Sequence, residues 1–187
     1  MNKLIKISLA IAYILLMYTF VNIYKADSSA KGAETALKEL NLPLAQKLAE
    51  RSIELNPNEP YYYRLLAKVY LTTSFSNKEY KDRALSLLDA SLKLNKNNLA
   101  TIRNNTPIYY YLALNNLSGA NGTVDKKYIK FASSHMTHYK KIYPTDLGLI
   151  VLFAKYEKKL NLMENYNESI KQIKILRPDV LKWYAGI

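Results

Sequence analysis

Two histidines, His135 and His138, lie three residues apart, a spacing that places both side chains on one face of a helix. Imidazoles in this arrangement could form part of a metal site. A structural zinc site needs four ligands, and no acidic residue lies within one helical turn of either histidine. The chain also has no cysteine to supply a thiolate. We therefore expect no metal here and interpret the pair as ordinary polar residues.

Motifs that mark common enzyme and cofactor sites are missing from the sequence. The phosphate-binding patterns GxGxxG and GxxxxGK[ST] do not occur, and neither HExxH nor GxSxG is found. The sequence thus offers no nucleophile, base or cofactor loop in a recognisable arrangement. We predict a non-catalytic protein that carries no cofactor.

Tyrosines and cations are the remaining residues with chemistry to offer. The stretch LNPNEPYYYRLLAKVY places Tyr61, Arg64 and Lys68 at helical spacing, so that they share a face. We expect Tyr63 and Tyr70 to pack between helices, Tyr62 to pack toward a neighbour and Tyr61 to stay accessible. A second run, Tyr109–Tyr111, repeats the pattern, and core packing is favoured over ligand stacking for both runs because buried aromatic rings mainly supply contact area.

Apolar residues recur at intervals of three and four through residues 25–187, as in Ala45, Leu48, Ala49 and Ser52, and no alternating strand pattern of useful length is present. The sequence therefore predicts an all-α fold. One spacing recurs four times, with a residue followed by others four, seven and twelve positions later. Each occurrence predicts the second helix of a helical hairpin. The segments are Ala45-Ala49-Ser52-Pro57, Ala84-Leu88-Ser91-Lys96, Ala132-Met136-Tyr139-Pro144 and Tyr166-Ile170-Ile173-Pro178.

The second of these units resembles a tetratricopeptide repeat, because Tyr63, Leu66, Ala67 and Tyr70 precede Ala84 at the positions of that family. The resemblance implies an α-solenoid of about four helical hairpins, with first helices that line a concave surface. We expect Pro107 to kink the first helix of the third hairpin or to make it restart. Val180–Tyr184 should form a short capping helix, with Trp183 over the last apolar face.

Read through that resemblance, five residues fall on the concave surface: Tyr61, Arg64, Lys68, Arg103 and Lys155. Such a surface could bind a protein partner through an acidic segment or a C-terminal carboxylate. The alternative is a solvated basic surface in a basic protein.

The first 24 residues predict a transmembrane anchor. Residues 7–24 carry no charge, and eighteen helical residues span roughly 27 Å, enough to cross a bilayer core. A cleaved signal peptide with a site near Ser28-Ser29-Ala30 is the alternative, although the apolar run is long for one. Lys3 and Lys6 favour a cytoplasmic N-terminus. We therefore predict a single-pass membrane protein whose body lies outside the cytoplasm.

The net charge of +12 is spread along the chain rather than gathered in one arm. A nucleic-acid or other polyanion binder would concentrate its positive charge on one face. Polyanion binding is kept only as a third hypothesis, which a steep loss of binding with salt would support.

A wider resemblance covers nearly the whole chain. The order of an apolar helix ending in YKADSSAKGAE, then LPLAQKLAERSIELNPNEPYYYRLLAKVY and a closing ILRPDVLKWY resembles the C-terminal part of bacterial O-antigen ligase or polymerase-like membrane proteins. No catalytic residue of that family can be carried over. The leading hypothesis is a membrane-tethered interaction scaffold, and the alternative is an accessory or detached tail of such a glycan-assembly protein.

Overall fold

The computed structural model describes residues 3–115 and 124–183. In these residues the fold is all-α, as predicted, and the only extended pairing is a single bridge between Leu114 and Val124. The helices in chain order are α1 (Lys3–Lys38), α2 (Leu42–Leu55), α3 (Pro60–Ser74), α4 (Tyr80–Leu94), α5 (Leu99–Leu112), α6 (Lys126–Ile142), α7 (Leu147–Lys159), α8 (Met163–Leu176) and α9 (Val180–Trp183).

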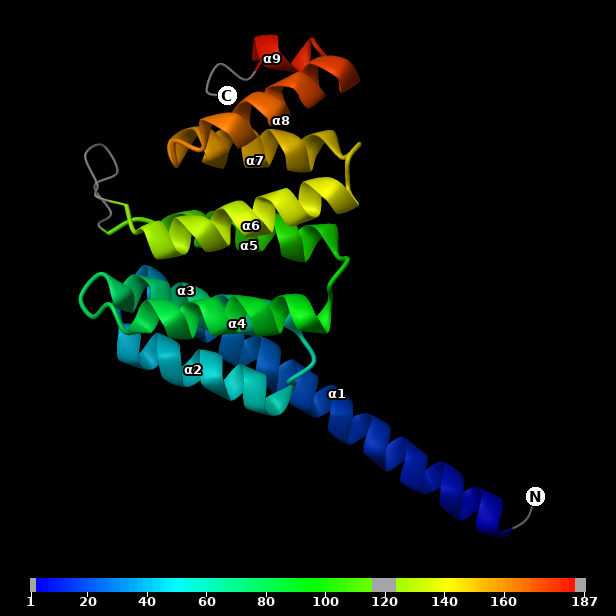
Figure 1. The fold of residues 1–187 in the computed structure, drawn as a ribbon. Coiled ribbons are helices and arrows are strands. Elements are labelled where there is room, and N and C mark those ends of the chain that lie inside the picture. The colour runs from blue at the N-terminus through cyan, green and yellow to red at the C-terminus, as the bar shows by residue number, and fades with distance from the viewer. Residues whose placement is uncertain (1–2, 116–123, 184–187) are drawn as a thin grey trace.

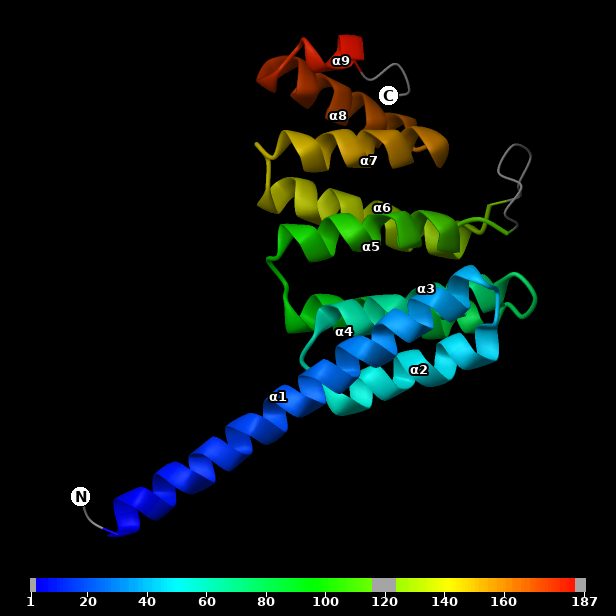
Figure 2. The ribbon, with the colours of Figure 1, turned by 180° about the vertical axis from the view of Figure 1, so that it is seen from behind.

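Successive helices pair as antiparallel hairpins, α1–α2, α3–α4, α5–α6 and α7–α8, and α9 lies at the end of the stack (Figure 1). The four second helices are the ones that the repeated spacing predicts. They form one layer of the stack. The first helices form the other layer, which Figure 2 shows from behind. The stack therefore has two surfaces where a ligand could bind, one on each layer of helices.

Helix α1 is continuous across the boundary predicted between residues 24 and 25. Its N-terminal part projects away from the stack with its apolar side chains exposed (Figures 1 and 2). From Ala26 onward the helix packs against α2, and Ala26, Ala30 and Ala33 are buried there. The predicted anchor and the first helix of the first hairpin are therefore parts of one helix.

Helix starts and tight turns have local causes in the sequence. Asn41, Asn98 and Asp146 each accept a hydrogen bond from a backbone N–H in the first turn of the following helix, as N-cap residues do. The turns after α1 and α7 pass through Leu40 and Asn161, both with positive φ. There the amides of Asn41 and Leu162 donate back to Ala36 and Glu157, which closes each helix end.

The main core runs through the stack, and a smaller one joins α7, α8 and α9. Ala67 and Ala84 are fully buried where the second hairpin closes, as predicted, and Tyr70 is buried too. Three expectations were wrong. Tyr62 rather than Tyr63 is the deeply buried tyrosine, and Tyr63 donates its hydroxyl to the Pro57 carbonyl near the surface. Helix α5 continues through Pro107 and does not restart before it, and Trp183 is exposed.

Candidate functional site

A groove of about 360 Å³ lies in the layer of first helices, where α1, α3 and α5 meet. Its lining is Leu37 from α1, Lys68, Leu71 and Thr72 from α3, and Asn104, Pro107, Ile108 and Tyr111 from α5. Leu71 and Ile108 are buried, whereas the Tyr111 side chain is 40% exposed. The groove therefore combines apolar walls with one lysine ammonium and one accessible phenol.

Arg64 lies one turn before Lys68 on α3, and Tyr61 lies two turns before it. The Arg64 guanidinium is 5.4 Å from the centre of the Tyr61 ring, a cation–π distance. Burial, with the nearby Glu34 carboxylate, raises the pKa of Tyr61 to about 12. Burial also lowers the pKa of Lys68, and the Arg64 charge lowers it further. The structure thus brings three of the five predicted residues together on α3, with Glu34 of α1 beside them.

Arg103 does not join this group. Its guanidinium makes an ion pair of 2.6 Å with Asp146, which also accepts a hydrogen bond from the Leu149 amide at the start of α7. Arg103 therefore links α5 to the connection between α6 and α7. Lys155 is exposed on α7, with its Nζ 5.9 Å from the Tyr156 ring centre, and is not among the residues that line the groove.

Sequence reasoning missed the contribution of α5 to the groove. Asn104, Pro107, Ile108 and Tyr111 follow one another at intervals of three, one and three, which is one face of a helix. That face could have been found from the same spacing that identified Arg64 and Lys68. The expected kink or restart at Pro107 argued against this face, because a helix interrupted there would not present these four residues on one continuous surface.

A second hollow lies in the other layer, between α4 and α6. It consists of two adjoining cavities of about 320 and 380 Å³ that share Asp89, Leu92, His138 and Tyr139. His138 lines both cavities, whereas His135 is buried and lines only the second. The His135 ring stacks on that of Tyr109, with the ring centres 4.3 Å apart. Residues 3–115 and 124–183 contain no cluster of three potential metal ligands.

His135 is held in its neutral form by its surroundings. Its Nε2 lies 3.1 Å from Thr106 Oγ1, and the Thr106 hydroxyl donates to the Ile102 carbonyl at 2.8 Å. Burial, followed by the nearby His138, lowers the pKa of His135 to about 3. A buried ring in this setting is a packing element of the α5–α6 hairpin.

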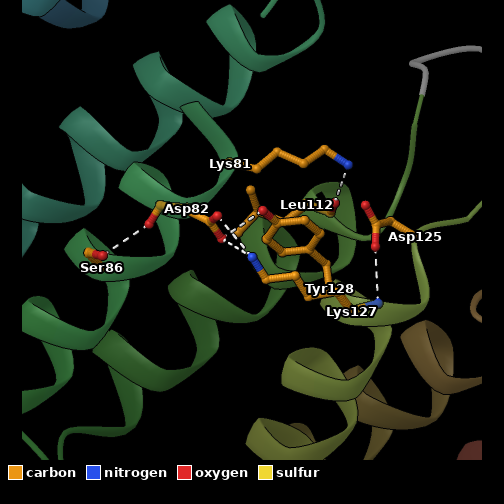
Figure 3. Close-up of polar contacts among 7 residues, drawn as sticks. All are labelled: Lys81, Asp82, Ser86, Leu112, Asp125, Lys127 and Tyr128. Atoms are coloured by element: carbon orange, nitrogen blue, oxygen red, sulfur yellow. Dashed lines mark hydrogen bonds and ion pairs between the residues drawn. The ribbon is translucent and has the colours of Figure 1, made fainter. Parts of the chain in front are cut away.

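A polar cluster ties α4 to the end of α5 and the start of α6 (Figure 3). The buried Lys81 donates from Nζ to the carbonyls of Leu112 and Leu114, both at 2.8 Å. Asp82 accepts from Lys127 Nζ at 2.6 Å and from the Tyr128 hydroxyl at 2.8 Å. A lysine at the C-terminal end of a helix satisfies its last carbonyls, so Lys81 serves the joint between two hairpins.

A second buried network joins α6, α7 and α8. Lys140 Nζ lies 2.9 Å from Glu157 Oε1 and 3.0 Å from Ser169 Oγ, and Ser169 donates to Glu157 Oε2 at 2.7 Å. All three side chains are buried. A serine, a lysine and a glutamate together could suggest nucleophilic chemistry. Ser169 is inaccessible, however, and its proton is directed to Glu157, so the network joins three helices.

Comparison with known proteins gives no family for this chain. No model of a known protein family matches it, and a search of curated proteins found no match. The inferences below therefore rest on the sequence and on the geometry of the groove and its surroundings.

Proposed function

We propose that the protein is a membrane-anchored scaffold of the tetratricopeptide type that binds a protein partner in the groove of α1, α3 and α5. The observation that carries this proposal is the groove itself. It draws residues from three successive first helices, and Lys68 adds a cation to apolar walls. An extended peptide with an acidic side chain or a free C-terminal carboxylate fits this chemistry, because charge-assisted hydrogen bonds give such pairs their strength.

The anchor is the N-terminal part of α1. One helix in the described residues is long and apolar enough to span a membrane, and it lies near the N-terminus, where a signal sequence would pass the same test. Its continuity with the first hairpin supports a retained anchor, because cleavage near Ser28 would cut a helix whose next residues are buried against α2. The lysines before the apolar run support a body outside the cytoplasm.

Arg64 and Lys68 are suited to meet an incoming carboxylate. Within residues 3–115 and 124–183, neither side chain makes an ion pair, whereas Arg103, Lys127 and Lys140 do. Partial burial near a second cation disfavours the charged form of Lys68, so a carboxylate that neutralises the pair would bind favourably. Glu34 limits this effect, because it already compensates part of the positive charge.

The test is selection from a peptide library with free C-terminal carboxylates, against the full chain in lipid nanodiscs. We expect acidic peptides whose affinity falls at least about tenfold when Lys68→Glu is introduced, since one charge-assisted hydrogen bond is worth about 1.5–3 kcal/mol. Lys130→Glu, an exposed lysine on α6, is the matched control and should leave the affinity unchanged. Selected peptides that bind equally well to both variants would refute the groove as the binding site.

A further inference from the structure

One edge of the stack gathers the C-terminal ends of the second helices. Because the hairpins are antiparallel and stacked in the same sense, α2, α4, α6 and α8 all end on the same side. The exposed part of α1 leaves the stack obliquely on this side, beyond α2 and away from the end formed by α8 and α9 (Figures 1 and 2). We call it the anchor-side edge, and it comprises the last turns of α4, α6 and α8 with the residues that follow them.

The last turns of these three helices share a composition. Each carries an exposed lysine followed directly by an exposed aliphatic residue. The pairs are Lys93–Leu94, Lys141–Ile142 and Lys174–Ile175, with 41%, 41% and 74% of the aliphatic residue exposed. Lys96, just beyond α4, is exposed as well. Lys93, Lys96 and Ile142 also line the hollow between α4 and α6. The exposed aliphatic side chains at the three successive helix ends form the apolar part of this edge.

Three carboxylates near this edge are engaged in ion pairs. Glu54 pairs with Arg51 at 3.0 Å, Asp146 with Arg103 at 2.6 Å and Asp179 with Arg177 at 2.7 Å. The lysines of the three helix ends have no such partner in the part of the chain that the structure describes. Lys93, Lys96, Lys141 and Lys174 therefore give this edge exposed positive charge.

We infer that the anchor-side edge lies on the surface of the bilayer and binds anionic lipid headgroups. Aliphatic side chains flanked by lysines suit this environment, because the apolar part enters the interface while the ammonium groups remain among the phosphates. Anionic lipid attracts each basic residue held near the surface. The inference rests on the proposed anchoring of α1.

The continuity of α1 makes this placement persistent. A helix that runs unbroken from Lys3 to Lys38 has no flexible linker between its exposed apolar part and the first hairpin. The direction in which α1 enters the bilayer therefore sets the orientation of the whole stack. The edge on that side is presented to the membrane, and the opposite turns, such as the one at Ser76 between α3 and α4, are directed away from it.

The experiment uses the full chain in vesicles and exploits its lack of native cysteine. Single variants Ile142→Cys and Leu94→Cys place a fluorophore at the edge, and Ser76→Cys places it on the opposite side. Leu15→Cys reports insertion of α1. Quenching is measured with lipids that carry a quencher near the headgroup or deep in the acyl chains, in phosphatidylcholine vesicles with and without phosphatidylglycerol. Circular dichroism checks that each variant is folded.

We expect headgroup-level quenching at Ile142 and Leu94 that exceeds the quenching at Ser76, and only in vesicles with phosphatidylglycerol. The combined change Lys93→Glu, Lys96→Glu and Lys141→Glu should abolish the difference. So should salt of about 1 M, where the Debye length is about 3 Å.

The outcomes separate this inference from the proposed function. A Leu15 label that deep quenchers do not reach would refute the anchor and the placement together. A quenched Leu15 label with equal quenching at Ile142 and Ser76 would overturn only the placement. Equal quenching at Ile142 with and without phosphatidylglycerol would overturn the role of anionic lipid.

Discussion

The first two hairpins and the last two are held together by different means. Between α1, α2, α3 and α4 the buried residues include a series of alanines beside larger apolar side chains such as Leu65 and Leu88. The alanines are Ala26, Ala30, Ala33, Ala45, Ala49, Ala67 and Ala84. From α5 to α8 the interior includes Thr106, His135, Lys140, Glu157 and Ser169, with aromatic rings around them. Alanine lets helices approach closely without directional bonds, whereas the polar groups must each find a partner.

The difference teaches how each half fixes its geometry. A small residue at a close approach excludes other helix arrangements by volume, since there is no room for a larger side chain. A network such as Lys140–Glu157–Ser169 excludes them by the loss of hydrogen bonds in any other register. Buried ion pairs add little net stability compared with apolar residues of the same size, so we interpret this network as a device for register.

The largest effect is expected when one partner of the buried Lys140–Glu157 ion pair is removed, and it tests the contrast between the two halves most directly. Lys140→Met leaves the buried Glu157 carboxylate uncompensated and should lower the free energy of unfolding by about 3–5 kcal/mol. The double variant Lys140→Met with Glu157→Leu should recover most of this loss. Chemical denaturation of the full chain in detergent micelles, followed by circular dichroism, measures both. A double variant as unstable as the single one would refute the register role.

The second prediction concerns the alanine-packed half. Ala67→Leu adds volume at a fully buried contact and should cost about 1–3 kcal/mol of unfolding free energy. Ala100→Leu, at an exposed position of α5, is the matched control and should change the stability by less than about 0.5 kcal/mol. Equal effects at the two positions would show that Ala67 is not at a close helix contact.

A third prediction concerns a buried polar residue of the second half that has no hydrogen-bond partner, in contrast to Lys140, Glu157 and Ser169. Both polar atoms of the Asn105 side chain are buried with no hydrogen-bond partner among the described residues. Asn105→Leu should therefore raise the free energy of unfolding by about 1–3 kcal/mol, because an unpaired amide loses its hydration on burial. The melting temperature measures the change. A destabilised variant would mean that Asn105 has a partner in the folded protein.

His135 gives the second half a pH dependence in the acid range, between about pH 3 and 6.5. Its pKa of about 3 in the folded protein lies below the ordinary value of about 6.5 in the unfolded chain. The unfolded chain therefore takes up the proton first, and stability falls as the pH drops from about 6.5 toward 3, by up to about 1.4 kcal/mol per pH unit. Above pH 6.5 this contribution is complete.

This effect is checked by measuring the free energy of unfolding between about pH 3 and 6.5 and comparing its slope with pH in the unmodified chain and in His135→Phe. His135→Phe keeps a ring beside Tyr109 but cannot titrate, so its stability should fall less steeply with acid over this range. His138→Gln changes the neighbouring histidine, which faces the α4–α6 hollow, and should keep most of the slope. Equal slopes in His135→Phe and the unmodified chain would show that another group titrates.

The smallest effect is expected at the surface of the first hairpin. Arg51 and Glu54 form an exposed pair one turn apart on α2. Arg51→Gln should change the free energy of unfolding by less than about 0.5 kcal/mol, because water and salt screen such pairs. Urea denaturation at low and high salt measures it. A loss comparable to that of Lys140→Met would contradict the distinction between buried and surface pairs.

Much of the fold could be read from the sequence because it depends on local repetition. The recurring spacing located all four second helices, and Ala67 and Ala84 were identified as close contacts. The candidate site was found in part. Helical spacing put Arg64 and Lys68 on one face, but the groove they border is completed by Leu37 and by the α5 residues around Ile108. Their approach depends on how hairpins stack, which no local pattern specifies.

The sequence by itself determined the class of fold, the number of hairpins and the apolar character of the N-terminal segment. These follow from periodicity and composition, which act within one helix or between neighbours in the chain. The tertiary structure decided that Arg103 pairs with Asp146, that Lys140 meets Glu157 and Ser169, and that α1 continues from its exposed apolar part into the first hairpin. Pairings of this kind join different helices, so only the packing of the stack brings their atoms within bonding distance.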